Sequence, residues 1–145
     1  MIFYFSGTGN TRWAAQKVAA ATADRLVNIA EEMLAAETDQ ASDPQFTYTL
    51  AQDERIGFFF PVHGWRPPRL VLDFLDRLHL TNADSHYAYV VCTAGDNVGE
   101  AVSILEKRLQ TMGIKIDSAI SLIMPESYVG LPFMDVDTPA KEQCK

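Results

Sequence analysis

Six consecutive residues near the start of the sequence could bind a ligand. Each carries a hydroxyl group, an amide or no side chain: Ser6, Gly7, Thr8, Gly9, Asn10 and Thr11. The glycines let the backbone turn tightly and approach a ligand closely. The hydroxyl and amide groups can donate hydrogen bonds to oxygen atoms. If a strand precedes this run and a helix follows it, backbone amides converge at the start of the helix, where negative charge is favoured. The run therefore predicts a binding site for an anion such as a phosphate group.

Two common phosphate-binding motifs do not fit this run. A Walker A loop requires a lysine directly after its second glycine, and Gly9 is followed by Asn10. The dinucleotide fingerprint requires Gly or Ala at position 12, where Arg12 stands. With neutral donors and no obvious metal-binding carboxylate nearby, the run favours a phosphate monoester that is bound rather than hydrolysed. A capped strand–helix turn that binds nothing is the alternative interpretation.

Two later stretches could complete a ligand site with this run. The first comprises Pro61, Val62, His63, Gly64 and Trp65, and the second comprises Thr93, Ala94, Gly95 and Asp96. Each lies at the end of a dense apolar run, at 55–62 and 86–93, that is typical of a buried strand. Loops that leave the carboxyl ends of parallel strands meet at the same edge of the sheet. We therefore expect the loops 6–11, 61–66 and 93–97 to form one site.

The order of apolar runs and helix-like segments predicts the fold that must bring these loops together. Strands are expected in five segments: 1–5, 26–29, 55–62, 86–93 and 114–125. Helices are expected in four segments between them: 11–23, 31–37, 66–78 and 98–113. The polar, turn-rich segment 37–53 is expected to be a loop with at most one short irregular element. The alternation of strand and helix predicts an α/β fold, in which a doubly wound parallel sheet carries helices on both faces.

The pattern changes after Pro125. Residues 126–145 contain two prolines and several acidic residues, without a clear amphipathic helix. We interpret 1–125 as one domain and 126–145 as an irregular tail, so that the final helix of the fold is missing or atypical and one face of the sheet is under-covered. Two explanations are open: the chain is a fragment of a longer protein, or a partner, such as a second copy in a homodimer, covers that face.

Composition and charge exclude several classes of function. The net charge of −7 argues against a nucleic-acid partner, because a phosphate backbone is neutralised by Lys and Arg. No apolar run approaches the roughly 20 residues that span a membrane. Met1 leads directly into a strand without room for a signal peptide, so a cytoplasmic protein is expected.

Cys92 and Cys144 are too few to hold an iron–sulfur cluster, which usually needs about four thiolates, and the spacing of the histidines implies no metal.

The phosphate-binding run also resembles a known motif. Ser6, Thr8, Gly9 and Thr11 match the pattern S/T-x-S/T-G-x-S/T, which is similar to the phosphate loop of the flavodoxin family. The resemblance implies a five-stranded sheet in the order 2-1-3-4-5 and flavin mononucleotide (FMN) as the cofactor, with its phosphate in the loop 6–11.

A closer resemblance concerns the end of the chain. The order of elements and the sequence MPESY at 124–128 are similar to the flavodoxin-like half of bacterial proteins that fuse such a domain to a dicluster ferredoxin. The resemblance implies a redox protein partner, either a ferredoxin-type iron–sulfur module or a reductase. This sequence itself contains no cysteine-rich module.

The flavodoxin resemblance also implies roles for the other two loops. Trp65 offers a flat surface on which the flavin ring can stack, although it could instead be an anchor at the start of the following helix. The peptide at Gly64 is expected to reorient beside the ring. Thr93 and the backbone of Ala94, Gly95 and Asp96 are expected to bond the pyrimidine edge of the ring, near which the Asp96 side chain places negative charge.

Several residues near these loops have roles that the sequence leaves open. His63 either faces solvent or forms a hydrogen bond with the edge of the ring. Tyr128 is a candidate to cover the outer face of the ring. Asn97 is expected to cap the helix that follows it, and Cys92 is expected to be a packed thiol.

Three functions fit these expectations. The first is an FMN-binding electron carrier, in which the cofactor performs the chemistry and the protein sets its potentials. The second is an FMN-dependent reductase that acts on NAD(P)H and a quinone-type substrate, for which the loops 61–66 and 93–97 are short. The third is a non-redox anion-binding domain of the same fold. The sequence favours the electron carrier.

Overall fold

The structure, a computed structural model, describes residues 1–38, 44–83 and 85–125 of the chain. Its centre is a five-stranded sheet with the order β2-β1-β4-β6-β7, in which every neighbouring pair is parallel. The strands are β1 (Ile2–Tyr4), β2 (Leu26–Asn28), β4 (Ile56–Pro61), β6 (Ala88–Ala94) and β7 (Ser118–Ile123). Two other strands lie outside this sheet. Counted without them, the order is 2-1-3-4-5, so the predicted α/β fold is confirmed.

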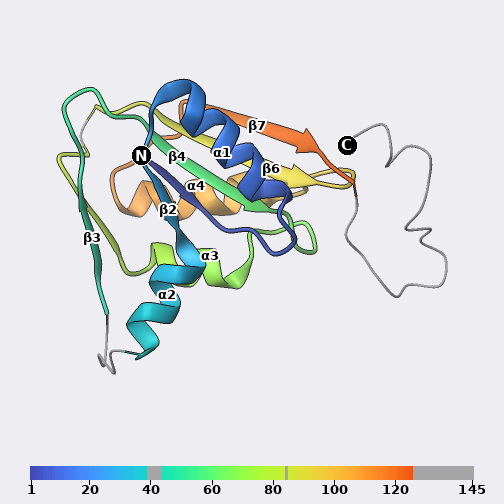
Figure 1. Cartoon of the computed structure of the whole chain (residues 1–145), viewed down its shortest axis with the longest axis horizontal. Helices are drawn as coiled ribbons and strands as arrows, with labels where there is room; N and C mark the ends of the chain where they lie inside the picture. The colour runs from blue at the N-terminus through green and yellow to red at the C-terminus, as the bar shows by residue number, and fades with distance from the viewer. Residues whose placement is uncertain (39–43, 84, 126–145) are drawn as a thin grey trace.

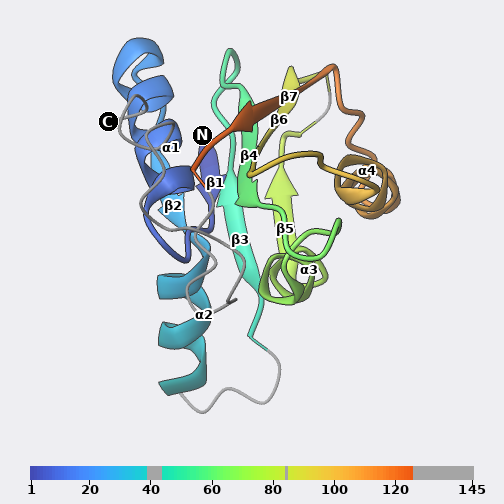
Figure 2. The same ribbon diagram turned by 90° about the vertical axis from the view of Figure 1, so that its right-hand side faces the viewer.

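Helices cover both faces of the sheet. They are α1 (Asn10–Thr22), α2 (Ile29–Thr38), α3 (Arg69–Leu75) and α4 (Ala101–Thr111). Figures 1 and 2 show α1 on one side of the sheet and α3 and α4 on the other. Because all five strands run the same way, the loops after β1, β4, β6 and β7 emerge at one edge of the sheet, where ligands of such folds bind.

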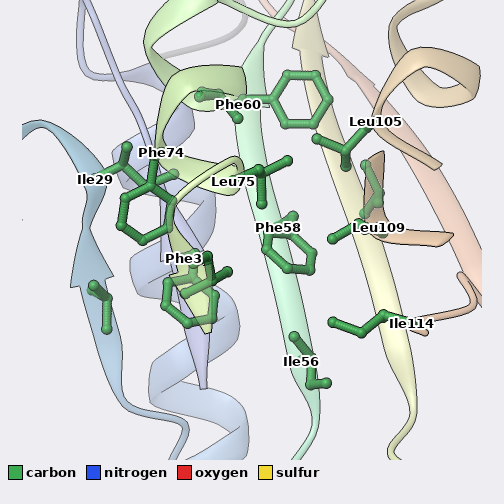
Figure 3. Close-up of a cluster of buried hydrophobic side chains, with 14 of the residues drawn as sticks. Phe3, Ile29, Ile56, Phe58, Phe60, Phe74, Leu75, Leu105, Leu109 and Ile114 are labelled. Carbon is green, nitrogen blue, oxygen red and sulfur yellow. The ribbon is translucent and has the colours of Figure 1, made fainter. Parts of the chain in front are cut away.

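The central strand β4 shows why the sheet needs helices on both faces. Its first five residues are all buried, as expected for a parallel strand covered on both sides. Alternate side chains of Ile56, Phe58 and Phe60 enter the core shared with α3 and α4, whereas Phe59 enters the core shared with α1. Figure 3 shows this larger core, where side chains of β4 meet Phe74 and Leu75 of α3 and Leu105 and Leu109 of α4.

Small residues bring α1 close to the sheet. Ala14, Ala15 and Ala19 are buried against strand residues that include Phe59 and Tyr89. A helix whose inner face is alanine can approach a sheet more closely than one that carries large side chains. The packing therefore places the first turn of α1 beside the carboxyl end of β6.

The segment predicted to be a loop, 37–53, contains a regular strand. Residues Phe46–Thr49 form β3, which pairs in parallel with β5 (Leu78–Thr81) in a separate two-stranded sheet. Phe46 is buried and Thr47 and Thr49 are exposed, so the strand alternates. The loop prediction is wrong here because β3 has only four residues and its partner lies about thirty positions further along the chain.

The helix predicted over 66–78 is shorter than expected. It spans only Arg69–Leu75. Leu78 is buried in the same core as Phe74, as its apolar character indicated, but it opens β5 instead of continuing the helix. The apolar Leu78 is compatible with one further turn of the helix and also with the start of a strand. Its pairing with Phe46 of β3 makes it part of a strand.

The last described strand, β7, is the most exposed strand of the sheet. Ile120 and Ile123 are 51% and 62% exposed, and β7 is shorter than the predicted segment 114–125. Residues 126–145 lie outside the described residues, so the domain boundary at 125 and the atypical final helix stay predictions. No helix in the described part of the chain is long and apolar enough to cross a membrane.

A test of the packing under α1 is available at Gly57 in β4. A methyl group at this position would lie 2.7 Å from the Cζ atom and 2.8 Å from the Oη atom of Tyr89, which is 8% exposed. We expect Gly57→Ala to lower the free energy of unfolding by about 1–3 kcal/mol, the usual cost of overpacking a core. Urea denaturation measures the change. Gly7→Ala, where a methyl group would meet no atom within 4 Å, is the control and should change stability far less.

Candidate cofactor-binding site

A cavity of about 350 Å³ lies at the carboxyl ends of the strands. This volume falls in the usual range for small-molecule sites, roughly 300–1,000 Å³. The residues that line it come from four segments at the carboxyl ends of β1, β4, β6 and β7: Ser6, Gly7, Thr8, Asn10 and Thr11; Pro61, Val62, His63 and Gly64; Thr93, Ala94 and Gly95; and Met124 and Pro125. The three loops singled out in the sequence therefore meet in one cavity.

The first loop presents its donors at the start of α1. Gly9 is the N-cap residue of this helix, with φ of 105°, and no side chain caps the helix there. The Gly9 amide donates instead to the Ser6 hydroxyl oxygen at 3.1 Å. The first amides of a helix have no partner within it, and no side-chain cap competes for those of α1. This is the arrangement that favours an anion.

A pair of threonines connects the first loop to the third. The Thr11 and Thr93 hydroxyl oxygens are 2.7 Å apart, and the two residues are 1% and 4% exposed. Thr93 was expected to bond a flavin ring. In this structure its hydroxyl is directed toward α1.

The second loop is a tight turn stabilised by two hydrogen bonds. The His63 amide donates to the Arg66 carbonyl at 2.9 Å, and the Arg66 amide donates to the His63 carbonyl at 3.2 Å. The two residues between them, Gly64 and Trp65, have φ of 55° and 62°, as in a type I′ turn. His63 and Gly64 line the cavity, and the His63 ring makes an edge contact with the Phe5 ring, with centroids 6.2 Å apart.

Trp65 does not line the cavity. Its carbonyl accepts a hydrogen bond from the Glu100 amide at 3.1 Å, its side chain is next to Gly99, and it is 63% exposed. The contacts with 99–100 hold Trp65 beside the start of α4. Stacking of Trp65 on a flavin ring therefore stays a prediction that this geometry does not itself support.

The remaining predicted site residues are Gly9 and Asp96, which also fall outside the cavity lining. Asp96 is exposed, and its carboxylate accepts a hydrogen bond from the Asn97 amide group at 3.2 Å. The prediction that Asn97 caps the next helix is wrong, because the N-cap residue of α4 is Glu100. Two residues between Asn97 and the N-cap, Val98 and Gly99, complete the turn.

Met124 and Pro125 line the cavity although they were not predicted to do so. They follow β7, and the Met124 amide donates to the Ala94 carbonyl at 2.8 Å. The Asn10 side-chain amide donates to the Pro125 carbonyl at 3.2 Å, which links α1 to this loop. The sequence could have predicted this, because loops that follow parallel strands meet at the same edge of the sheet, and the loop after β7 is one of them.

The site has little charge of its own. Among the described residues that line the cavity there is no Lys, Arg, Asp or Glu. No group of residues in the described ranges could hold a metal ion. Burial raises the pKa of the neighbouring Cys92 thiol to about 12, so this thiol is protonated and unreactive at neutral pH.

Comparisons with solved structures agree with this architecture. A provisionally named flavoprotein from Bacteroides uniformis has a TM-score of 0.56 and 20% identity, over 84% of this chain and 88% of that one. The Trp repressor binding protein from Bacillus subtilis has a TM-score of 0.56 and 16% identity, over 83% and 81%. A flavoprotein from Lactobacillus acidophilus, solved in complex with FMN, has a TM-score of 0.52 and 14% identity, over 83% and 90%.

The chain has the flavodoxin-like fold. The strand order and these structural matches both show it. No protein-family model matches the sequence, and no curated protein matches it either. At identities of 20% and below, the likeness concerns the fold alone.

The contact between Gly99 and Trp65 can be tested with a matched pair of variants. Gly99 and Gly113 have φ of 51° and 77°, so alanine at either position costs about 1–2 kcal/mol of backbone energy. A methyl group at Gly99 would also collide with Trp65 Cβ and lie 2.9 Å from its Cδ1 atom, whereas at Gly113 it meets no atom within 4 Å. We expect Gly99→Ala to lower the free energy of unfolding more than Gly113→Ala, and to shift the tryptophan emission. Equal losses and unchanged emission would contradict the contact.

Proposed function

We propose that this chain binds FMN and acts as an electron-transfer flavoprotein. The observation that carries the proposal is the loop 6–11, whose uncharged donors stand at the start of α1 in the same cavity as the loops after β4 and β6. A phosphate monoester is the natural ligand of such a loop, and a planar group attached to it would extend toward the other two.

The lining fits the separate parts of FMN. The dianionic phosphate requires donors only, and the loop 6–11 supplies amides and hydroxyls at the positive end of a 13-residue helix. The isoalloxazine ring requires apolar surface with a few polar groups, and the walls formed by Pro61, Val62, Ala94 and Met124 together with His63 supply them. The FMN complex of the Lactobacillus acidophilus flavoprotein, which has the same fold, supports this assignment.

We assign the redox chemistry to the cofactor and its binding to the protein, because few of the described residues that line the cavity could act as catalytic side chains. Bound FMN supplies one- and two-electron transfer. The described residues that line the cavity include no acid–base pair and no metal-binding cluster. The chain therefore binds and orients the cofactor, and the walls of the cavity control which part of the ring meets water.

An electron carrier fits the described loops better than a reductase with its own small substrate. The loop after β4 turns back at His63–Arg66, and the loop after β6 leads within a few residues to α4. We expect such short loops to leave the edge of a bound ring accessible to a protein partner. The net charge of −7 favours a partner with a basic surface. The proposed partner is a redox protein, either a ferredoxin-type iron–sulfur module or a reductase. An FMN-dependent quinone-type reductase is the alternative.

The first test compares FMN with riboflavin, which lacks the phosphate. Hydrogen bonds to a charged group are worth about 1.5–3 kcal/mol each, so the loss of two or more should weaken binding at least about 100-fold. Isothermal titration of the purified protein with each compound measures the difference. Equal affinities would remove the assigned role of the loop 6–11, and no binding of either would contradict the proposal as a whole.

The second test removes two hydroxyl groups from the loop. Thr8→Ala combined with Thr11→Ala should weaken FMN by about two orders of magnitude or more and leave riboflavin affinity nearly unchanged. Thr47→Ala, an exposed threonine of β3, is the control for a general effect of the substitution. Unaltered FMN affinity in the double variant would mean that the phosphate binds elsewhere.

The third test separates carrier from reductase. The FMN-loaded protein should accept electrons in stepwise reductive titrations followed by absorption spectroscopy. As a carrier, it should pass them rapidly to a redox protein and show negligible steady turnover of NAD(P)H with quinones. Sustained turnover with those small substrates would support the reductase, and a protein that binds phosphate compounds without any flavin preference would support the non-redox alternative.

A further inference from the structure

Thr11 and Thr93 form a buried polar contact. The two residues are 1% and 4% exposed, and their hydroxyl oxygens are 2.7 Å apart. They lie 82 positions apart, in the first turn of α1 and near the end of β6. Both line the cavity.

The chemistry of the hydroxyl group sets the direction of this hydrogen bond. Each hydroxyl has one proton to donate and lone pairs to accept. If Thr11 donates to Thr93, Thr11 has no proton left for an anion. If Thr93 donates to Thr11, the Thr11 proton is available to the cavity. A phosphate dianion offers only acceptors, so its binding selects the second arrangement.

We propose that Thr93 is a positioning residue for the phosphate, acting through Thr11, and not a ligand of the flavin ring. The inference rests on the proposed function. The Thr93 hydroxyl donates to Thr11, and the Thr11 hydroxyl then donates to the phosphate. Hydrogen bonds in such a chain polarise and strengthen one another. The arrangement also ties β6 to the helix whose first turn receives the anion.

The backbone around Thr93 is consistent with this assignment. The Thr93 carbonyl accepts a hydrogen bond from the Val62 amide at 2.9 Å, and the Ala94 carbonyl accepts one from the Met124 amide at 2.8 Å. These bonds hold the end of β6 between its neighbouring strands. The sheet therefore determines the position of the Thr93 backbone, from which its hydroxyl oxygen lies 2.7 Å from that of Thr11.

The test is a double-variant cycle with two ligands. Thr11→Val, Thr93→Val and the combined variant keep the side-chain shape and remove the hydroxyls. FMN and riboflavin affinities are measured by isothermal titration for each. We expect Thr11→Val to weaken FMN about 10- to 100-fold and Thr93→Val to weaken it about 3- to 10-fold. Riboflavin affinity should stay within about twofold in both. In the Thr11→Val background, Thr93→Val should add almost nothing.

Two further variants at Thr93 test whether the effect on FMN affinity comes from loss of the hydroxyl group. Thr93→Ser keeps the hydroxyl and should restore FMN affinity to within about twofold of the unaltered protein. If Thr93→Val does not fold, as judged by circular dichroism, Thr93→Ala makes the same comparison with a smaller side chain.

The outcomes distinguish this inference from the proposed function. Equal losses for FMN and riboflavin in Thr93→Val would show that Thr93 contacts the ring or serves packing only, and would overturn the inference. Additive losses in the combined variant, or an unaffected FMN affinity in Thr93→Val, would overturn it as well while FMN binding itself stands. If the unaltered protein does not bind FMN, the proposed function and this inference fail together.

Discussion

The double burial of β4 is the constraint on which the rest of the structure depends. A strand whose residues from Ile56 to Phe60 are all buried, four of them large and apolar, loses contact with water only if both of its faces are covered. Full burial of one phenylalanine side chain is worth about 1.5–3 kcal/mol, and β4 contains three of them. Helices must therefore lie on both sides, and the crossovers they form keep the strands parallel. Parallel strands release their loops at a common edge, so the cavity is a consequence of how β4 is buried.

The chemistry of the cavity follows from the way α1 meets the sheet. Its inner face is mostly alanine, and the helix comes close enough for Thr11 to reach Thr93 across the end of β6. The same placement aims the open start of the helix into the cavity. Neutral donors held in this way can bind a dianion without a lysine or arginine, because the helix dipole and the amides supply the positive potential. A site with little charge of its own also leaves the protein free to tune a bound cofactor through the walls of the cavity.

Most of the residues that line the cavity were named from the sequence, and the differences share one cause. The loop after β1 and the two loops after β4 and β6 were identified from local patterns, and twelve of the residues named in them line the cavity. Met124 and Pro125 were not named, although the rule for the other loops applies to them too, and their place in the cavity depends on the pairing of β7 with β6. The flavodoxin resemblance implied that Trp65 stacks on a flavin ring, which stays a prediction, and the structure places its side chain next to Gly99 and outside the cavity lining. In each case the deciding contact is with a residue distant in sequence.

The class of fold, the order of the apolar runs and the prediction of an anion site at the loop 6–11 all come from the amino-acid sequence. These properties depend on burial periodicity and on the types of neighbouring residues, which are local. Only the tertiary structure decided that Leu78 begins a strand paired with β3, that the Thr93 hydroxyl is directed toward Thr11, and that Trp65 lies outside the cavity. Those outcomes depend on which distant groups compete for the same hydrogen bond or space, and no local pattern contains that information.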